Sequence, residues 1–480
     1  MRLLPLLALA LALPLAGCGG GAPSGPNVLL ISVDSLRADR VGAYGHRARF
    51  AGGEAVSPTV DALAAEGVCF EEAVSTSSWT LPAHAALLTG LPDALHGLTD
   101  SARRLDPGHI TLAELLAGHG WRTGGFWSGV NLHPAFGFSQ GFERYVNCSE
   151  VEVDVAQFSS EDNDALFNYH EASHDTLTSE DVVSATLDWV GSLEGEAPFF
   201  AFVHLWDPHY DYLPPEEYAR RFDPQYAGPA HGRNFMNPRQ HWRGREMEHV
   251  LALYDAEIRY TDDHIARLLQ GLEALGERED TLVVFTADHG DEFYEHGKKG
   301  HQRTLYEEVV RVPMILSWPG HLPAGVRPRG SARLQDVYAT VARLCGLESA
   351  DWIEGRDLAP AWERAEAGQE DESLAAPQHL LLRLPKKNVH LEGLRNERFK
   401  VIWDHVAERG EWFDLQRDPL ERQPQVFDSL DAVELPAVAA LRALMADVEA
   451  RASSVPRTDG HGAQRLPASV VEELERLGYL

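Results

Sequence analysis

Cysteine and positive charge are both scarce in this 480-residue sequence. It has four cysteines, and 42 Lys and Arg stand against 73 Asp and Glu, which gives a net charge of −31 at pH 7. A surface this acidic repels polyanions, which argues against nucleic acid as a partner. An anionic substrate would need local positive charge, and a bound metal ion is the simplest source of it. The length predicts one large domain with an appendage, or two to three smaller ones.

The cysteines beyond position 18 carry no recognisable chemistry. Cys69, Cys148 and Cys345 lack the spacing of zinc ligands, and three cysteines cannot all pair. Cys69 and Cys345 lie in apolar contexts, so we expect them to be buried free thiols. No internal repeat is visible either.

The apolar run at residues 3–15 is too short to span a bilayer comfortably as a helix. Arg2 precedes it and Leu-Ala-Gly-Cys follows, an arrangement typical of a signal peptide. The tetrapeptide resembles the bacterial lipobox, which implies cleavage after residue 17 and lipidation of Cys18. We therefore expect an exported, membrane-anchored bacterial lipoprotein, periplasmic or at the cell surface. An ordinary secretory signal with an incidental cysteine is the alternative.

The alternation of apolar runs with helical patterns predicts an α/β fold, with a largely parallel central sheet flanked by helices. Near-continuous aliphatic runs, typical of strands buried on both faces, cover residues 27–34, 198–204 and 281–289. Helical patterns cover residues 56–66, 84–88, 111–119 and 250–272. A smaller C-terminal α+β subdomain is expected to follow.

The predicted organisation has five parts. They are a lipoprotein signal peptide (1–17), a lipidated Gly/Pro/Ser-rich tether (18–26), a catalytic domain (27–346), an acidic, Ala-rich linker (347–376) and a C-terminal subdomain (377–480). Within the catalytic domain, residues 214–245 lack periodicity and are predicted to form a long loop over the site.

Each predicted strand ends in residues that can bind a metal or an anion. They are Asp34, His204, Asp288 and His289. Because ligands gather at the carboxyl ends of parallel strands, we expect these side chains to meet at one edge of the sheet.

A short helix is expected to begin at Thr80, because Pro82 is typical of a first turn and Gly90 of a helix end. Thr80 is then either a simple N-cap residue or a nucleophile whose hydroxyl pKa is lowered by the helix dipole and a metal. Asp34, Thr80, Asp288 and His289 would form a mixed O/N metal site. The imidazole favours zinc or manganese, with calcium and magnesium left open.

Taken in order, these segments resemble the sulfatase family of the alkaline-phosphatase superfamily. The resemblance spans residues 27–422 and is carried by residues 27–39, 78–90, 111–116, 137–142, 286–313 and 411–419. It implies the superfamily's fold and metal-dependent hydrolysis of a sulfate or phosphate ester of a small molecule, glycan or lipid.

The sequence departs from the family pattern at the nucleophile. A sulfatase converts the first residue of Cys/Ser-x-Pro-Ser/Ala-Arg to formylglycine, but here the segment reads Thr80-Leu-Pro-Ala-His84. Threonine cannot become the aldehyde, and the motif's arginine is His84. The family's paired aspartates are Asp34-Ser35, its Gly-Lys-Trp-His-Leu-Gly segment has no counterpart, and its later lysine falls near Gln302.

An unmodified threonine is used by the superfamily's phosphodiesterases and phosphoethanolamine transferases. By resemblance to them, His209 and His301 occupy positions that bind phosphate or a second zinc, or protonate the leaving oxygen. His84, His204 and Arg303 are the predicted substrate-binding residues. The alternative for His204 and His209 is a purely structural role.

These features favour a phosphoester, because a threonyl phosphate is hydrolysed by attack at phosphorus. A threonyl sulfate lacks the elimination route of the formylglycine hydrate. One alternative is a sulfate-ester hydrolase, arylsulfatase-like, that works without the modification. The other is a catalytically silent lipoprotein that binds anionic glycans, although the joint presence of Asp34, Thr80, Asp288 and His289 argues against it.

Overall fold

The computed structural model describes residues 25–129, 131–149, 177–195, 197–369, 372–431, 436–452, 455–456 and 464–465. The expected signal peptide, Cys18 and almost all of the tether lie outside these residues. In the described part of the chain, no helix combines the length and the apolar character needed to cross a membrane.

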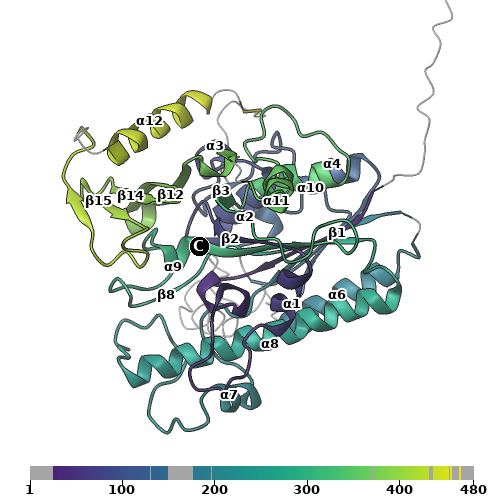
Figure 1. Ribbon diagram of the computed structural model, residues 1–480, viewed down its shortest axis with the longest axis horizontal. Helices are drawn as coiled ribbons and strands as arrows, with labels where there is room; N and C mark the ends of the chain where they lie inside the picture. Colours follow the sequence, from purple (N-terminus) through teal and green to yellow (C-terminus); the bar gives the residue numbers. More distant parts are fainter. Residues whose placement is uncertain are drawn as a thin grey trace, which may run out of the picture.

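Three inner strands form the centre of the molecule, and they are the three predicted runs (Figure 1). They are β7 (Thr281–Ala287), β1 (Asn27–Val33) and β6 (Phe199–Leu205). Every residue in them is buried, as expected for apolar strands covered on both faces. β1 pairs in parallel with both neighbours, which puts Ser32 level with His204 and Thr286. The three carboxyl ends therefore meet at one edge, as predicted.

The outer strands complete an eight-stranded sheet. They are β4 (Arg122–Trp127), β5 (Arg144–Asn147), β10 (Arg311–Ser317), β2 (Val68–Val74) and β11 (Ser331–Arg333). The order is β11-β2-β10-β7-β1-β6-β4-β5, and within this sheet β10 alone runs antiparallel to its neighbours. The segment between β7 and β10 contains no long crossover helix, so β10 starts from the edge where β7 ends. The prediction of a largely parallel sheet is confirmed.

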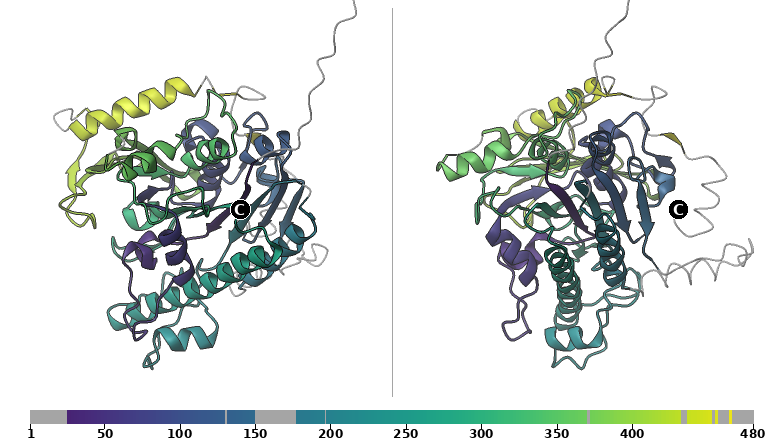
Figure 2. Two further views of the ribbon diagram at one scale, coloured as in Figure 1. Left: turned by 45° about the vertical axis from the view of Figure 1, so that its right-hand side comes forward. Right: turned by 90° about the vertical axis from the view of Figure 1, so that its right-hand side faces the viewer.

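Helices cover both faces of this sheet (Figures 1 and 2). One face carries α1 (Pro58–Glu66), α6 (Ser179–Gly191) and the long α8 (Arg245–Leu275), with α7 (Glu216–Phe222) against α8. The other face carries α2 (Thr80–Thr89), α4 (Leu112–Gly118) and α10 (Asp336–Leu344). α7 interrupts the loop expected at residues 214–245. It is stabilised by packing that periodicity does not reveal, because Tyr218 contacts Tyr260 of α8 edge to face.

The C-terminal part forms a second, antiparallel sheet beside the first (Figure 1). Its strands, in order, are β12 (Gln378–Leu384), β13 (Val389–Arg395), β14 (Phe399–Asp404), β15 (Arg409–Asp414) and β16 (Gln425–Phe427). One face packs on α12 (Pro436–Arg451), and the other joins the main core through Leu380, Leu382 and Ile402. The smaller C-terminal unit of strands and a helix is therefore confirmed.

Short elements connect these layers. The helical ones are η1 (Ala38–Arg40), η2 (Gly42–Tyr44), α3 (Asp93–His96), η3 (Pro134–Phe136), α9 (Glu307–Val310), α11 (Ala359–Glu366), η5 (Glu372–Ala375) and η6 (Pro385–Lys387). Two small sheets pair β8 (Glu292–Phe293) with β9 (Lys299–Gly300) and β3 (Arg103–Arg104) with β17 (Gln464–Arg465). α11 lies within the segment expected to be a linker, and its Trp362 packs on Phe70. Cys69 and Cys345 are buried free thiols, as expected.

Candidate active site

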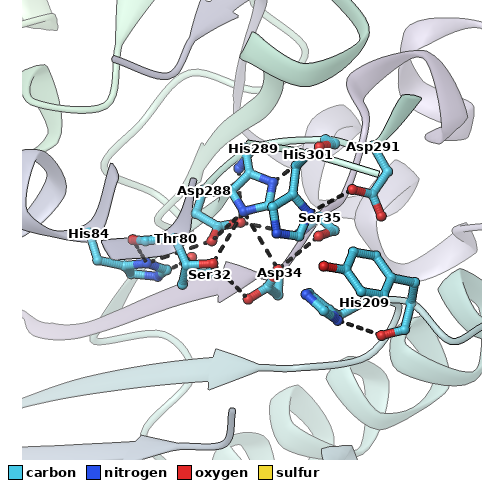
Figure 3. Close-up of polar contacts among 12 residues, drawn as sticks. Ser32, Asp34, Ser35, Thr80, His84, His209, Asp288, His289, Asp291 and His301 are labelled. Carbon is cyan, nitrogen blue, oxygen red and sulfur yellow. Dashed lines mark hydrogen bonds and ion pairs between the residues drawn. The ribbon is translucent and has the colours of Figure 1, made fainter. Parts of the chain in front are cut away.

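The carboxyl edge of the inner strands holds a buried group of acidic and imidazole side chains (Figure 3). Asp34 follows β1, Asp288 and His289 follow β7, and His204 is in β6; all four are fully buried. His289 Nε2 lies 3.4 Å from Asp288 Oδ2 and 3.8 Å from Asp34 Oδ1. His204 Nε2 lies 3.4 Å from Asp34 Oδ2. The structure thus brings together the residues that the strand ends predicted.

Thr80 points into this group from the first residue of α2. Trp79 is the N-cap residue of the helix, and no side chain caps it by a hydrogen bond. The Thr80 hydroxyl instead donates to Asp34 Oδ2 at 3.4 Å, and its oxygen lies 3.2 Å from His289 Nε2. This geometry favours a functional hydroxyl over a simple capping residue.

The carboxylates at this edge are buried, and no described Lys or Arg forms an ion pair with Asp34 or Asp288. Among the described residues, Asp34 and Asp288 form ion pairs with histidines only. Burial raises the pKa of Asp34 to about 6, and burial together with the charge of Asp34 raises the pKa of Asp288. Burial also lowers the pKa of His204 to about 4, so this ring does not supply positive charge at neutral pH.

These donors fit a divalent cation. One ligand atom from each of Asp34, Asp288 and His289 can be chosen so that all lie within 4.8 Å of one another. Asp288 Oδ2 is buried and accepts no hydrogen bond from any described residue. His289 Nδ1 donates to the carbonyl of Gly290 at 3.1 Å, which directs Nε2 at the carboxylates, as is usual for a metal-binding histidine.

His84 lies directly behind Thr80 and is fully buried. Its Nδ1 donates to the Thr80 carbonyl at 2.9 Å, and its Nε2 lies 3.0 Å from the Ser32 hydroxyl. Burial lowers its pKa to about 3, helped by the nearby His204. With both ring nitrogens in contact with protein atoms, His84 is better suited to positioning the first turn of α2 than to touching a substrate.

His301 directly follows β9, the second strand of the β8–β9 hairpin, and lies at the same edge of the sheet. Its ring lies 4.3 Å from the ring of His289, centroid to centroid. Nδ1 donates to Asp291 Oδ1 at 2.7 Å, and the Tyr212 hydroxyl donates to Asp291 Oδ2 at 2.7 Å. Burial raises the pKa of Asp291 to about 6. His301 and Asp291 therefore form a buried, hydrogen-bonded pair next to His289, one of the candidate metal ligands.

His209 lies next to this pair, with its ring 5.1 Å from that of His301. It stacks on Trp206 at 3.9 Å, and its Nδ1 donates to the Tyr210 carbonyl at 2.6 Å. The predicted proton donors, His209 and His301, are thus neighbours at one site.

Arg303 is exposed, just beyond the buried group. The preceding backbone amide, of Gln302, donates to the Ser78 carbonyl at 3.0 Å, so this segment passes close to the start of α2.

The sequence reasoning missed Asp291 and Tyr212. Asp291 could have been found, because it stands two residues after His289 in a carboxylate-rich segment. Tyr212 could not, since only the fold shows that the segment after β6 reaches Asp291.

Comparison with known proteins identifies the family. A sequence model of the family "Sulfatase" matches residues 26–347, and one described as N-sulphoglucosamine sulphohydrolase, C-terminal, matches residues 295–448. The ulvan-active sulfatase of Formosa agariphila is 27% identical over 349 residues, which cover 70% of this chain and 65% of that protein. The chain therefore spans slightly less than two thirds of the length of this relative.

Solved structures share the fold. The phosphonate monoester hydrolase of Agrobacterium radiobacter superposes with a TM-score of 0.69 at 23% identity, covering 89% of this chain and 96% of that one. A protein solved with its substrate D-glucosamine-2-N,6-O-disulfate superposes with a TM-score of 0.68 at 19% identity, covering 90% and 99%. The first family model covers the whole central sheet and every residue of the buried edge described above. This chain belongs to the sulfatase family of ester hydrolases, whose members typically use a divalent metal.

Proposed function

We propose that this chain is a metal-dependent hydrolase that cleaves a phosphate or sulfate ester through Thr80, with a phosphoester, including a phosphodiester, as the favoured substrate. The observation that carries the proposal is the position of the Thr80 hydroxyl. It lies at the start of α2, 3.4 Å from Asp34 Oδ2 and 3.2 Å from His289 Nε2.

Asp34, Asp288, His289 and the Thr80 oxygen would hold the metal, with zinc or manganese favoured and calcium or magnesium left open. Such an ion supplies positive charge for the ester oxygens in the transition state. Asp34 accepts the hydrogen bond of the Thr80 hydroxyl and so orients the attacking oxygen. The N-terminal end of α2 adds a favourable dipole for developing negative charge.

The reaction would proceed by two displacements. Thr80 Oγ1 gives its proton to Asp34, which accepts its hydrogen bond, and forms a bond to phosphorus as the bond to the leaving oxygen breaks. A histidine gives the leaving oxygen a proton. His301 is suited to this role because Asp291 holds its Nδ1 proton and fixes the ring. His209 is the second candidate. Water then attacks phosphorus, releases the acid and restores the threonine.

A sulfate ester is the second candidate substrate. It is supported by relatives such as the ulvan-active sulfatase of Formosa agariphila. Against it stands the chemistry of threonine, whose sulfate ester lacks the elimination step of a formylglycine hydrate. Substrates of either kind would be small-molecule, glycan or lipid esters.

The test is an assay of the soluble, lipid-free protein on a nitrophenyl sulfate, a nitrophenyl phosphate monoester and a bis-nitrophenyl phosphodiester. Each is run after chelation and with manganese, zinc, magnesium or calcium restored. Thr80→Ala should lower kcat/KM by at least about 1000-fold. Thr89→Ala is the matched control, because Thr89 lies at the other end of α2 and, among the described residues, its hydroxyl bonds only the Ala85 carbonyl and the Leu91 amide.

Each outcome has a distinct meaning. Turnover of phosphoesters that needs metal and Thr80 supports the proposal. Sulfate turnover that needs Thr80 favours the second candidate, and full activity in Thr80→Ala overturns the nucleophile. Metal-loaded protein that hydrolyses none of these esters would favour the alternative of a lipoprotein that binds anionic glycans without catalysis.

We also propose that the protein is anchored to a membrane through lipidated Cys18. The support is the residue pattern at 2–18. Cys18→Ser should move the protein from the membrane fraction to the soluble fraction, whereas unchanged fractionation would contradict the anchor.

A further inference from the structure

Three histidines and a glutamate share one face of the C-terminal sheet, outside the catalytic group. His379 is in β12, His390 and Glu392 are in β13, and His405 directly follows β14. His379 pairs with Leu394, and Glu392 pairs with Trp403. Because residues two apart in a strand, and residues directly opposite across strands, point to the same side, the four side chains converge.

Glu392 lies at the centre of this cluster. Its Oε1 lies 2.7 Å from His379 Nε2, and its Oε2 lies 3.0 Å from His405 Nε2. The rings of His390 and His405 stack at 4.0 Å, with 15° between their planes. Ligand atoms from His390, Glu392 and His405 can be chosen within 4.8 Å of one another.

The packing of the sheet does not require these polar side chains. On the same face, Leu394, Val401 and Trp403 form an apolar cluster with α12. The side chain of Glu392 is only 13% exposed, yet its ion pairs in the described chain are with histidines alone. A largely buried carboxylate between imidazoles, without Lys or Arg, is an arrangement suited to a cation from outside.

We propose that His390, Glu392 and His405 form a second metal site, for a divalent transition-metal ion and preferentially zinc. Ligand atoms around tetrahedral zinc are roughly 3.3 Å apart for bonds of about 2.0–2.1 Å, close to the 3.0 Å between Glu392 Oε2 and His405 Nε2. To point a ring nitrogen at the same ion, the ring of His390 has to rotate out of its stack with His405. This rotation is about χ2, a torsion with a broad energy minimum in histidine. The other oxygen of Glu392, Oε1, contacts His379 Nε2. A metal-bound carboxylate usually has such a hydrogen-bonding partner that fixes its orientation.

The site would tie β13 to the turn after β14 and so stabilise the C-terminal sheet. These segments are already joined by the backbone hydrogen bond from His405 N to His390 O, at 2.9 Å. An ion that binds the folded chain and not the unfolded one raises stability by mass action. The site is therefore assigned a structural role, independent of the proposed ester hydrolysis.

The experiment uses the full lipid-free chain, stripped of metal and titrated with zinc, with bound zinc counted by elemental analysis. Wild type should bind one equivalent more than His390→Ala, His405→Ala or Glu392→Gln. His379→Ala should keep that equivalent with affinity weakened about 10–100-fold. His321→Ala, which removes an exposed histidine that stacks on Trp318, is the matched control and should bind as wild type does.

Two further measurements separate this site from the catalytic one and from misfolding. In an Asp288→Asn background, cobalt should still give the visible absorption of a tetrahedral site, and His405→Ala should abolish it. Glu392→Gln keeps the size of the side chain but weakens its contacts with His379 and His405, so the metal-free protein should melt slightly lower than wild type. The zinc-induced rise in melting temperature should vanish. Equal zinc stoichiometry in wild type and all three ligand variants would overturn the proposal and leave a hydrogen-bonded cluster without metal.

Discussion

Two groups of buried carboxylates in this molecule have opposite surroundings. At the catalytic edge, Asp34 and Asp288 form ion pairs only with histidines in the described chain, and burial raises the pKa of both. At the start of α10, Asp336 is equally buried, but Arg333 and Arg356 each reach one of its oxygens at 2.7 Å. Although burial raises the pKa of Asp336, the two guanidinium charges lower it below its ordinary value.

The difference sets the structural carboxylate Asp336 apart from the two carboxylates to which we assign a function, Asp34 and Asp288. Where the chain supplies its own cation, the buried charge is compensated, and removing either partner destabilises the fold. Where it supplies none, the charge is left for a cation or a reaction to satisfy, and perturbed pKa values of this kind concentrate at functional sites. Glu307 follows the structural pattern, because Arg395 and Lys400 lower its pKa despite burial.

The sharpest test of the comparison is Asp288→Asn. We expect kcat/KM to fall by at least about 1000-fold, because the metal loses a charged ligand. The metal-free protein should be no less stable, since the substitution removes repulsion between Asp288 and Asp34. Activity assays and thermal unfolding in chelator measure the two effects. A large loss of metal-free stability would show that Asp288 stabilises the fold as Asp336 does.

Asp336→Ala should have the opposite effect, a large loss of stability with little loss of activity. It leaves Arg333 and Arg356, whose side chains are 14% and 18% exposed, without their carboxylate, which should cost up to about 3–5 kcal/mol in the free energy of unfolding. Activity per folded molecule should change little. The control is Asp357→Ala, whose partner Arg343 is half exposed, so the loss should be about 1 kcal/mol or less. Urea unfolding gives both values, and equal losses would count against this assignment.

Asp291→Ala should have a smaller effect on catalysis than Asp288→Asn. It removes the acceptor that fixes His301, and we expect kcat to fall about 10–100-fold with metal content retained. Tyr212→Phe, which removes only the hydrogen bond behind Asp291, should lower kcat less. Steady-state kinetics and elemental analysis test this, and unchanged kcat in Asp291→Ala would remove His301 as the proton donor.

The smallest expected effect is a pH dependence from His296. Burial lowers its pKa, but the Glu308 carboxylate, 2.5 Å from Nδ1, raises it to about 9. Because the folded pKa lies above the unfolded value, the stabilisation is complete below about pH 6.5 and is lost as the pH rises through 9. Wild type should exceed His296→Gln in urea stability at pH 6.5, with the gap closing by pH 10. A gap that stays constant with pH would contradict this interpretation.

Part of the fold was predictable because it depends on local pattern. The apolar runs at β1, β6 and β7 are long enough to indicate buried parallel strands, and Pro82 and Gly90 delimit α2. α7 and α11 were missed, because both are short and are stabilised by contacts such as that of Trp362 with Phe70. The roles of His84 and Arg303 as substrate contacts remain predictions.

The sequence by itself determined the family resemblance, the α/β class and the meeting of acidic and imidazole residues at the strand ends, since a parallel sheet brings carboxyl ends together. Only the tertiary structure decided which carboxylates have arginine partners, that Asp291 holds His301, and that three histidines of the C-terminal sheet converge around Glu392. The physical reason is that these contacts depend on strand register and on how turns pack, which no local pattern of residues encodes, even where the partners are only 10 to 13 residues apart.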